Sequence, residues 1–536
     1  MVKGATHPKQ WSERVAELNS KGMLTADQKE TLGKMITSPD KENFILAQEI
    51  LKAKMSEKLI EGLNEDQTIA FAEILEFFTD TQEDAFVLKG YAGTGKTYLV
   101  KRIIEYITAS YPARRIAVTA PTNKAVQVLQ ANAPYNSKSS TSLVFEDLFN
   151  SASQMEYMTI HKLLGLKEQI TASGQQLFKA DGKNKSEITK FKYLIVDEVS
   201  MLDDHLCNEI LKHSSGLKIL FMGDPAQIPP VNKEDCIPFH EDHDYSFRRA
   251  ELTEIMRQKG DHPVVDASFL LRNNLQVNQP IPVLETNLND AGHGIEYYNS
   301  ETDRKMIRPL LNQYFNCDAF RENADHAKVI AWRNKTVDYM NSIIRELMYG
   351  EDIEPYVVGE KLIARKPIFE LKTGGRYPQW QIQFNTSEEM EVEEVKILTK
   401  RKFEGQYNMQ MKVYQLKVKG YDAVNRIHFK NYISVIHPDS AAEYKALLKQ
   451  AKDRAIEMRE AKRWVTYFNI LKWTADVAYN YAITCHKAQG STYKNVFLME
   501  EDIDLNRKTR ERNRIKYTAY SRPTDKLFIL RKNYQQ

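Results

Sequence analysis

Residues 90–97, which read GYAGTGKT, constrain the fold of this chain more than any other segment. They follow the apolar run AFVLKG and precede the amphipathic run KTYLVKRIIEYI, so the sequence predicts a strand, a tight loop and a helix in that order. Glycines in such a loop let successive backbone N–H groups turn inward on a phosphate, and the helix N-terminus adds positive potential. The Lys96 ammonium would reach the β- and γ-phosphates of a nucleotide, and the Thr97 hydroxyl would ligate Mg²⁺. The residues expected to contact the nucleotide in this loop are Gly90, Ala92, Gly93, Thr94, Gly95, Lys96 and Thr97.

Short apolar runs alternate with amphipathic runs from residue 64 onward. The first set of apolar runs comprises AFVLKG, RIAVTAP, KYLIVDE and LKILFMGD, and the second comprises AKVIAWRN, YAITCHKAQG, KNVFLME and KLFILRK. A break near residues 258–263 separates the two sets. Alternation of this kind predicts parallel sheets with helical crossovers, so we expect an α/β fold class with two such domains.

Two other segments differ from this pattern. Residues 354–475 begin with alternating apolar and polar residues, which predict a small antiparallel β unit, and continue from residue 440 as long charged helices. Residues 1–60 read as helices without a chemical motif, so we expect an accessory domain that is either structural or a docking element for a protein partner. The expected organisation is 1–60, the accessory domain; 61–256, the first α/β domain; 257–353 and 476–536, the two parts of the second; and 354–475, the inserted domain.

The length and composition exclude several classes of protein. A chain of 536 residues should form about three or four domains, so a single small module is excluded. Its 42% hydrophobic and 27% charged residues are typical of a globular protein and argue against a disordered one. Lys and Arg number 75 against 72 Asp and Glu, so any nucleic-acid surface must be a local basic stripe. The four cysteines lack metal-ligand spacing, and no apolar run approaches the roughly 18–20 residues of a membrane span, so we expect a cytosolic protein.

A pair of carboxylates, Asp197 and Glu198, follows the apolar run at residues 193–196. Proteins of the α/β class place ligand groups at the carboxyl ends of their strands, so Asp197 would hold Mg²⁺ and Glu198 would polarise an attacking water. The alternative is that the pair only caps a helix. The phosphate-binding loop upstream favours the first interpretation.

Three polar side chains elsewhere are candidates for contact with a nucleotide. Arg257 and Arg522 could neutralise the charge that builds on the γ-phosphoryl group, although an isolated arginine is normally a surface ion-pair residue. The Gln67 amide offers a donor and an acceptor side by side and could pair with adenine. The alternative for Gln67 is a capping box with Asn64, and both interpretations can hold.

The motifs along residues 60–536 resemble, in identity and in order, those of the superfamily 1 helicases, specifically the 5′-to-3′ branch that includes Dda-like and RecD-like enzymes. These motifs are Gln67, GYAGTGKT, the APTNKA run from Ala120, TIH from Thr159, VDEVSM from Val196, GDPAQIPPV from Gly223, LTEIMR to Arg257, WRNKTVDYMN from Trp332, ITCHKAQGST from Ile483 and YTAYSR to Arg522. The sequence departs from the family pattern at Thr492, where RecD-like relatives often carry an acidic residue, and in the AYSRP run around Arg522. Residues 1–63 and 131–158 have no equivalent in the compact phage members of the branch.

The resemblance implies an ATP- and Mg²⁺-dependent DNA helicase that moves 5′-to-3′ on single-stranded DNA through two RecA-like domains. It implies that the inserted domain is an SH3-like β unit with a helical arm, that Gln227 senses the γ-phosphate, and that Arg257 and Arg522 are arginine fingers. It also adds Gln489 and Gly490 to the nucleotide site. The positions it implies for contact with the DNA strand offer hydroxyls, amides and cations without a base-reading pattern. They are Pro121, Thr122, Asn123, Thr159, His161, Asn334, Thr484, His486 and Lys487.

Residues 166–181 read as a β-hairpin, with the turn at residues 172–174 and Phe178 on the returning strand. Similar helicases use such a hairpin as a pin at the DNA fork, so Phe178 could stack on the last base pair; the alternative is a packing residue under a loop. Trp464 in the helical arm could brace the pin or the strand, and the alternative is an ordinary core residue between helices.

Two other functions fit the same motifs. One is a strand-bound ATPase that remodels nucleoprotein without unwinding duplex, and the other is an RNA-directed helicase. Activity on naked duplex DNA separates the first from a DNA helicase, and stimulation by strands with 2′-hydroxyls identifies the second. We expect single-stranded and forked DNA as partners, no membrane association, and a monomer as the active unit.

Overall fold

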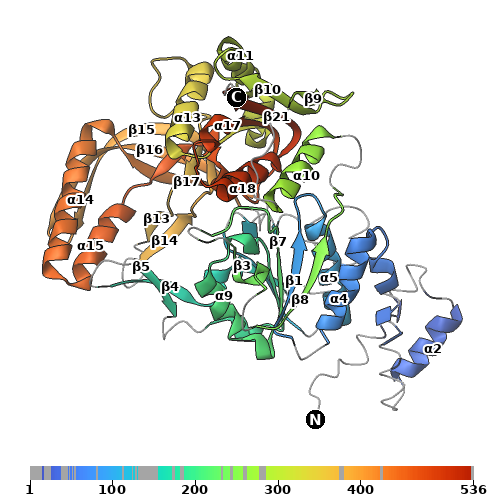
Figure 1. The fold of residues 1–536 in the computed structure, drawn as a ribbon. Helices are drawn as coiled ribbons and strands as arrows, with labels where there is room; N and C mark the ends of the chain where they lie inside the picture. The colour runs from blue at the N-terminus through green and yellow to red at the C-terminus, as the bar shows by residue number, and fades with distance from the viewer. Residues whose placement is uncertain are drawn as a thin grey trace.

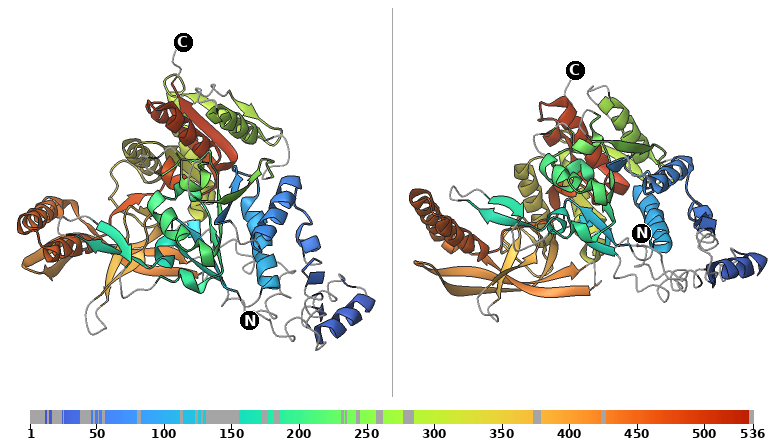
Figure 2. Two further views of the ribbon diagram at one scale, coloured as in Figure 1. Left: turned by 60° about the horizontal axis from the view of Figure 1, so that its bottom comes forward. Right: turned by 90° about the horizontal axis from the view of Figure 1, so that it is seen from below.

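The structure is a computed structural model, whose fold is shown in Figure 1. It describes residues 12, 15–16, 24, 26–37, 46, 49–50, 52–53, 56–79, 83–111, 114–122, 125–126, 129–130, 155–171, 176–180, 186–230, 233, 235–241, 245–256, 262–276, 285–372, 379–422 and 427–532. Two α/β domains lie against each other. A β-rich arm with the helices α14 (Pro438–Met458) and α15 (Ala461–Lys472) projects to one side. The helix α2 (Ala26–Thr37) lies on the other side, as both views in Figure 2 show.

The first domain is built on a six-stranded sheet in which all the strands are parallel. The strand order is β3 (Met155–Thr159), β2 (Ile116–Ala120), β6 (Tyr193–Val196), β7 (Lys218–Gly223), β1 (Ala85–Gly90) and β8 (Phe247–Leu252). The helices are α4 (Glu65–Phe77), α5 (Lys96–Ser110), α8 (Ile160–Leu163) and α9 (Asp204–Leu211), with 3₁₀ turns η3 (Ile188–Lys190), η4 (Val199–Met201), η5 (Ser214–Gly216) and η6 (Ile237–Phe239). The inner strands are buried on both faces, which is why their sequences are continuous apolar runs.

The second domain contains a six-stranded sheet that is parallel except for its last pair of strands. The strand order is β19 (Ala482–Thr484), β11 (Ala327–Ala331), β20 (Tyr493–Met499), β21 (Pro523–Arg531), β10 (Gly294–Asn299) and β9 (Asn287–Leu288). The helices are α10 (Pro263–Gln276), α11 (Arg304–Phe315), α12 (Asp318–Glu322), α13 (Asn334–Tyr349), α16 (Cys485–Ala488), α17 (Glu500–Ile503) and α18 (Thr509–Tyr520), with the 3₁₀ turn η7 (Ala324–His326). The two parallel sheets confirm the predicted α/β fold class.

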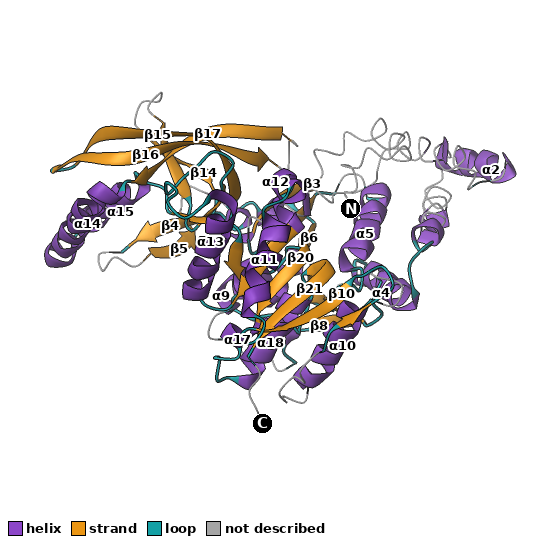
Figure 3. Ribbon diagram, turned by 90° about the horizontal axis from the view of Figure 1, so that it is seen from above, coloured by secondary structure: helices purple, strands orange, loops and turns teal. Residues whose placement is uncertain are grey.

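The chain leaves the second domain after α13 and returns to it at β19. The segment between these elements forms a five-stranded antiparallel sheet and a separate two-stranded one. The five strands, in sheet order, are β17 (Ile427–Ile436), β16 (Tyr407–Asp422), β15 (Glu389–Glu404), β12 (Lys361–Ala364) and β18 (Val477–Tyr479), and the two are β13 (Ile368–Lys372) and β14 (Gln379–Phe384). Figure 3 shows the long strands β15, β16 and β17 as one layer, with α14 and α15 beside it.

A short hairpin stands outside the main sheet of the first domain. Its strands, β4 (Leu166–Ile170) and β5 (Gln176–Ala180), pair antiparallel with each other and place Phe178 opposite Glu168. Figures 1 and 3 both show the hairpin on the side that faces the arm, and β4 contacts α15. A hairpin of the first domain and the inserted segment are therefore in contact.

Within the ranges that the structure describes, no helix combines the length and the apolar character needed to span a lipid bilayer.

Candidate nucleotide site and nucleic-acid interface

The loop between β1 and α5 has the backbone conformation that a phosphate cradle requires. Gly93 and Gly95 have φ values of 84° and 78°, in the left-handed region that favours glycine. A Cβ atom at Gly95 would collide with the Gln67 amide, so a side chain at residue 95 would have to displace Gln67 from its position against the loop. The loop therefore keeps its successive amides at the N-terminus of α5, where an anion is favoured.

Lys96, the first residue of α5, folds back over this loop. Its Nζ donates hydrogen bonds of 2.5 Å to the Gly90 carbonyl oxygen and 3.0 Å to the Tyr91 carbonyl oxygen. Thr97 follows it with an exposed side chain. The ammonium and the hydroxyl thus come from the same turn of helix, as contact with phosphate and Mg²⁺ would require.

Asp197 and Glu198 follow the carboxyl end of β6. The Asp197 N–H donates a 2.8 Å hydrogen bond to the Thr119 carbonyl oxygen on β2, and the Glu198 N–H donates one of 2.8 Å to Asp197 Oδ1. Glu198 has a φ of 52°, an uncommon conformation for a residue with a side chain and one that concentrates at functional sites. The local backbone thus holds the carboxylates at the edge of the sheet from which the phosphate loop also emerges.

The electrostatics of the carboxylate pair point to a cation. Burial and the neighbouring Glu198 carboxylate raise the pKa of Asp197, and burial raises the pKa of Glu198, while Lys96 opposes both shifts. Lys96 therefore lies within electrostatic range of both carboxylates. Oxygen donors from Thr97 and Asp197 suit Mg²⁺, which is commonly held by one or two protein oxygens together with substrate phosphates. The described residues contain no ready-made cluster of three or more His, Cys, Asp or Glu ligands for a metal.

Gln67 contacts the phosphate loop and caps α4. Its backbone N–H donates to Asn64 Oδ1 at 2.8 Å, and its Oε1 accepts from the Asn64 N–H at 3.2 Å, which is the capping box of the alternative interpretation. Its Nε2 donates a 3.0 Å hydrogen bond to the Thr94 carbonyl oxygen. Contact between this amide and adenine stays a prediction.

The second domain reaches the same site through the segment after α16. Gln489 Nε2 donates a 3.1 Å hydrogen bond to Ser200 Oγ on the first domain. A Cβ atom at Gly490 would lie 3.6 Å from Glu198 Oε1, so the backbone of residue 490 lies beside this carboxylate. The motif around Gln489 and the motif around Glu198 are thus in direct contact.

Of the two arginines expected near the γ-phosphate, the structure describes Arg522. Arg522 is buried, and its guanidinium donates to the Thr518 and Ser491 carbonyl oxygens and to the Ser521 hydroxyl, at 2.8, 3.1 and 2.7 Å. Its positive charge also lowers the pKa of Glu198, second to the effect of Lys96 among the cations. Arg522 therefore lies near the carboxylate pair while its hydrogen bonds are within its own domain. Arg257 lies outside the described residues.

Gln227 follows β7 and lies beside Asp224. Its Nε2 donates a 3.3 Å hydrogen bond to Asp224 Oδ2. Its Oε1 is buried and has no hydrogen-bond partner among the described residues. A buried acceptor without a partner is costly, so this oxygen is available to a water or a ligand at the site.

The positions expected to contact DNA occupy equivalent places in the two domains. Thr159 ends β3, an edge strand, and its hydroxyl accepts from the Lys162 N–H at 3.4 Å to cap α8. Thr484 ends β19, the edge strand of the other sheet, and its hydroxyl accepts from the Lys487 N–H at 3.4 Å to cap α16. Each threonine therefore begins a short helix that carries a histidine and a lysine.

The remaining expected strand contacts are surface or partly buried residues. Burial lowers the pKa of His161, of His486 and of Lys487. Pro121 and Thr122 follow β2 and are partly exposed, and Asn334 is exposed at the start of α13. Asn123 lies outside the described residues.

Of the two aromatic residues assigned to the fork, the structure describes the side chain of Trp464 and only the backbone of Phe178. The backbone of Phe178 is placed in β5, whereas its side chain lies outside the described residues. Trp464 is only 5% exposed, with the rings of Tyr467 and Phe468 at 5.7 and 6.3 Å from its own. Direct stacking of a DNA base on Trp464 would therefore require α15 to move, and its role in bracing the pin stays a prediction.

Sequence reasoning missed a carboxylate that orders the loop before Asn334. Asp502, 2% exposed on α17, accepts hydrogen bonds of 2.9 and 2.8 Å from the Trp332 and Arg333 N–H groups, of 2.6 Å from Arg333 Nε and of 2.7 Å from the Thr336 hydroxyl. Asp502 lies three residues beyond the end of β20, whereas Asp197 comes directly after β6. A carboxylate just beyond a strand end was the signal that could have identified it.

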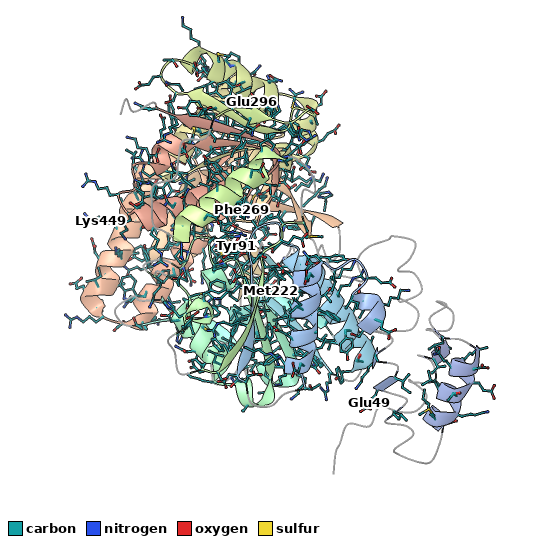
Figure 4. All side chains as sticks on the ribbon, turned by 45° about the vertical axis from the view of Figure 1, so that its right-hand side comes forward. Glu49, Tyr91, Met222, Phe269, Glu296 and Lys449 are labelled. Atoms are coloured by element: carbon teal, nitrogen blue, oxygen red, sulfur yellow. The ribbon has the colours of Figure 1, made fainter. Side chains whose placement is uncertain are left out.

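A second group missed from the sequence joins the phosphate loop to the second domain. The guanidinium of Arg272 on α10 lies 4.2 Å from the centre of the Tyr91 ring and 4.6 Å from that of Phe269. Figure 4 shows Tyr91 where the two domains meet, below the helix that carries Phe269. Burial raises the pKa of Tyr91 to about 12. The nucleotide site is thus a boundary between domains.

Comparisons with known proteins agree with this arrangement. Residues 62–282 match the family model for an AAA domain, and residues 479–530 match that for a UvrD-like helicase C-terminal domain. The ATP-dependent DNA helicase dda of Enterobacteria phage T4 is 26% identical over 451 residues, which cover 82% of this chain and 92% of the phage protein. The mimivirus protein R530, from Acanthamoeba polyphaga mimivirus, is 26% identical over 510 residues, 87% of this chain and 99% of its own.

A bacterial subunit and a solved structure are also similar. The RecBCD subunit RecD of Buchnera aphidicola (strain APS) is 24% identical over 364 residues, 59% of this chain and 58% of RecD. The crystal structure of Pif1 helicase from Candida albicans aligns with 88% of this chain and 94% of its own, with a TM-score of 0.45 and 17% identity. From its ordered motifs and these sequence relatives, the chain is related to the superfamily 1 DNA helicases of the 5′-to-3′ branch, and it is similar to phage Dda and to RecD-like helicases.

Proposed function

We propose that this protein is an ATP-dependent DNA helicase that translocates 5′-to-3′ on single-stranded DNA and unwinds duplex DNA. The observation that carries the proposal is the meeting of Lys96 and Glu198 from the first domain with Gln489, Gly490 and Arg522 from the second at one interface. A nucleotide bound at such an interface couples its own hydrolysis to the relative position of the two domains. That coupling is the requirement for a motor on a nucleic-acid strand.

The residues divide the work of hydrolysis among themselves. Lys96 leaves the carbonyl oxygens of residues 90 and 91 to meet the β- and γ-phosphates, and the loop amides hold the phosphate chain. Thr97 and Asp197 would hold Mg²⁺, which neutralises phosphate charge when bound. Glu198 accepts a proton from the water whose oxygen attacks the γ-phosphorus, while the bond to the β,γ-bridging oxygen breaks.

Cations from the second domain complete the site in this proposal. The charge that develops on the γ-phosphoryl oxygens would be stabilised by Arg522, whose five N–H donors include three that bond to Thr518, Ser491 and Ser521. Arg257 would supply a second cation. Gln227 would sense the γ-phosphate through Oε1, the buried acceptor that no described residue satisfies.

Strand movement follows from the matched positions on the two sheets. Thr159 and Thr484, each capping a short helix at the carboxyl end of an edge strand, would hold the backbone of single-stranded DNA in one domain and the other. Closing and opening of the interface then changes the distance between the two grips, so the strand advances with each ATP. The β4–β5 hairpin would part the duplex, with Phe178 on its returning strand as the residue that stacks on the last base pair.

Strand separation on naked DNA tests this function. A forked duplex without any bound protein should be separated by the wild-type chain with ATP and Mg²⁺, and by neither the Lys96→Ala variant nor the wild type without ATP. Hydrolysis stimulated by single-stranded DNA without strand separation would instead identify a remodelling ATPase. Equal stimulation of hydrolysis by RNA would identify an RNA-directed enzyme. We further expect a monomer to suffice and residues 1–60 to serve a protein partner.

A further inference from the structure

The hydroxyl of Tyr517 connects two separate parts of the first domain. Tyr517 lies on α18 of the second domain and is 2% exposed. The Ala92 N–H, in the phosphate loop, donates a 3.1 Å hydrogen bond to the Tyr517 oxygen. The Tyr517 hydroxyl donates one of 2.8 Å to Asp224 Oδ2, just beyond β7. A single phenol group therefore accepts from one nucleotide-site motif and donates to another.

Asp224 links Tyr517 to Gln227, the expected γ-phosphate sensor. Its side chain is fully buried, and Oδ1 accepts from the Ala226 N–H at 2.9 Å. Its Oδ2 accepts from both the Tyr517 hydroxyl and Gln227 Nε2, the latter at 3.3 Å. The two donors share one oxygen, so a displacement of Tyr517 changes the position that Gln227 can take. Gln227 Oε1, which has no partner among the described residues, moves with it.

The rest of α18 joins the two domains along the same face. Arg510 and Arg514 donate hydrogen bonds of 3.0 and 2.5 Å to Asp235 of the first domain. Residues 510, 514 and 517 are spaced by four and three, which places them on one side of the helix. Arg522 follows directly after this helix. When α18 shifts relative to the first domain, Tyr517 and Arg522 must therefore shift together.

We propose that Tyr517 is a positioning residue, an inference that rests on the proposed hydrolysis of ATP. Tyr517 fixes the orientation of Gln227 and of the phosphate loop according to the distance between the two domains. With α18 seated, Tyr517 holds Asp224, and Asp224 holds Gln227 Nε2, so that Oε1 faces the nucleotide site. With α18 withdrawn, Ala92 and Asp224 both lose a partner, and Gln227 loses its orientation. Hydrolysis is thereby confined to the seated arrangement.

The test compares Tyr517→Phe with Tyr520→Phe. Tyr520 is also buried on α18, and its hydroxyl donates a 3.0 Å hydrogen bond to Glu500 Oε1 within the second domain, so its variant loses a matched buried hydroxyl that does not cross the interface. We expect Tyr517→Phe to lower kcat of DNA-stimulated ATP hydrolysis about ten- to a hundredfold, with KM for ATP within about twofold of wild type, because the loop and Lys96 remain. Tyr520→Phe should keep kcat within about twofold. Adding Asp224→Asn to Tyr517→Phe should cause little further loss, since both changes break one chain of contacts.

The possible outcomes distinguish a positioning role of Tyr517 from a packing role. A kcat for Tyr517→Phe equal to that of Tyr520→Phe overturns the proposal, and so does a rise in KM and a fall in Tm that together account for the loss, because these would make Tyr517 a packing residue. If Tyr517→Phe does not fold, Asp224→Asn with Tyr517 intact must show the same isolated loss of kcat, and a normal kcat there overturns the proposal. Absence of hydrolysis by the wild type would instead refute the proposed function.

Discussion

The Gln489 amide on the second domain donates a 3.1 Å hydrogen bond to the Ser200 hydroxyl, two residues past Glu198 on the first. This bond holds Gly490 beside the Glu198 carboxylate. It ties the segment after α16, which begins at Thr484, to the residue expected to activate water. In the proposed function, a DNA strand bound at Thr484 and a nucleotide bound at Glu198 would therefore both contact or adjoin the segment from Thr484 to Gly490.

Loss of this bond should weaken the response of the ATPase to DNA. We expect Gln489→Leu to lower the DNA-stimulated kcat about five- to tenfold, as for the loss of one buried neutral hydrogen bond of roughly 1 kcal/mol. The matched control is Gln383→Leu, which removes a 3.4 Å bond to the Tyr432 carbonyl oxygen in the inserted segment and should leave kcat unchanged. Equal rates for the two variants would show that the Ser200 contact carries no signal.

Lys96 and Glu198 should fail at different stages of the ATPase cycle. Lys96→Ala removes the ammonium that meets the phosphates, so nucleotide affinity should fall. Glu198→Gln keeps the shape of the site and removes the proton acceptor, so binding should persist while turnover falls by at least about a hundredfold. Equilibrium binding of a fluorescent ATP analogue and steady-state hydrolysis measure the two effects. Near-normal turnover in Glu198→Gln would contradict the assignment of the base.

Asp502 should matter for DNA rather than for ATP. Asp502→Asn weakens the charged bond to Arg333 and the bonds that fix residues 332–336, so affinity for single-stranded DNA should fall about three- to tenfold while KM for ATP stays constant. The neighbouring Glu501, whose carboxylate accepts from the Ser300 hydroxyl, provides the control Glu501→Gln, which should bind DNA normally. Fluorescence anisotropy with a labelled oligonucleotide reads out both. Unchanged affinity in Asp502→Asn would separate this loop from the DNA interface.

The inner strands of both sheets could be predicted from the sequence because burial on two faces leaves a continuous apolar run, as in KYLIVDE for β6 and KNVFLME for β20. The edge strand β8, FRRAEL, is not predicted from the sequence because half of its residues are charged and most of them are only partly buried. The strand β3, MEYMT, is not predicted from the sequence either, although the TIH motif begins at its last residue, Thr159. Apolar runs in the sequence therefore identify buried strands, and they do not identify strands that are only partly buried.

The sequence predicts those parts of the site that lie within a single motif. It does not predict the hydrogen bonds that join a motif of one domain to a motif of the other. The loop at residues 90–97 and the carboxylates after β6 lie together as their strand order requires. The contacts of Tyr517 with Ala92 and Asp224 depend on how two domains dock, which no spacing along the chain encodes. The same holds for Gln489 and Ser200.

Phe178 should be needed for unwinding and not for movement. Phe178→Ala should leave DNA-stimulated hydrolysis and translocation nearly intact, whereas the loss of one stacking contact of about 1–3 kcal/mol should slow unwinding roughly five- to a hundredfold. Phe178→Trp should retain much of the rate. The neighbouring residue of β5, Leu177, gives the control Leu177→Ala. An unchanged ratio of unwinding rate to translocation rate in Phe178→Ala would contradict the assignment of Phe178 as the residue that separates the strands.

The direction of movement tests the account most directly. Two duplexes of identical sequence, one with a 5′ single-stranded tail and one with a 3′ tail, are mixed with the wild-type protein, ATP and Mg²⁺ under single-turnover conditions, and strand release is followed by fluorescence. A 5′-to-3′ helicase should release the strand rapidly from the 5′-tailed duplex, should release none above background from the 3′-tailed duplex, and should release none from either with Glu198→Gln. Preferential opening of the 3′-tailed duplex would contradict the 5′-to-3′ direction.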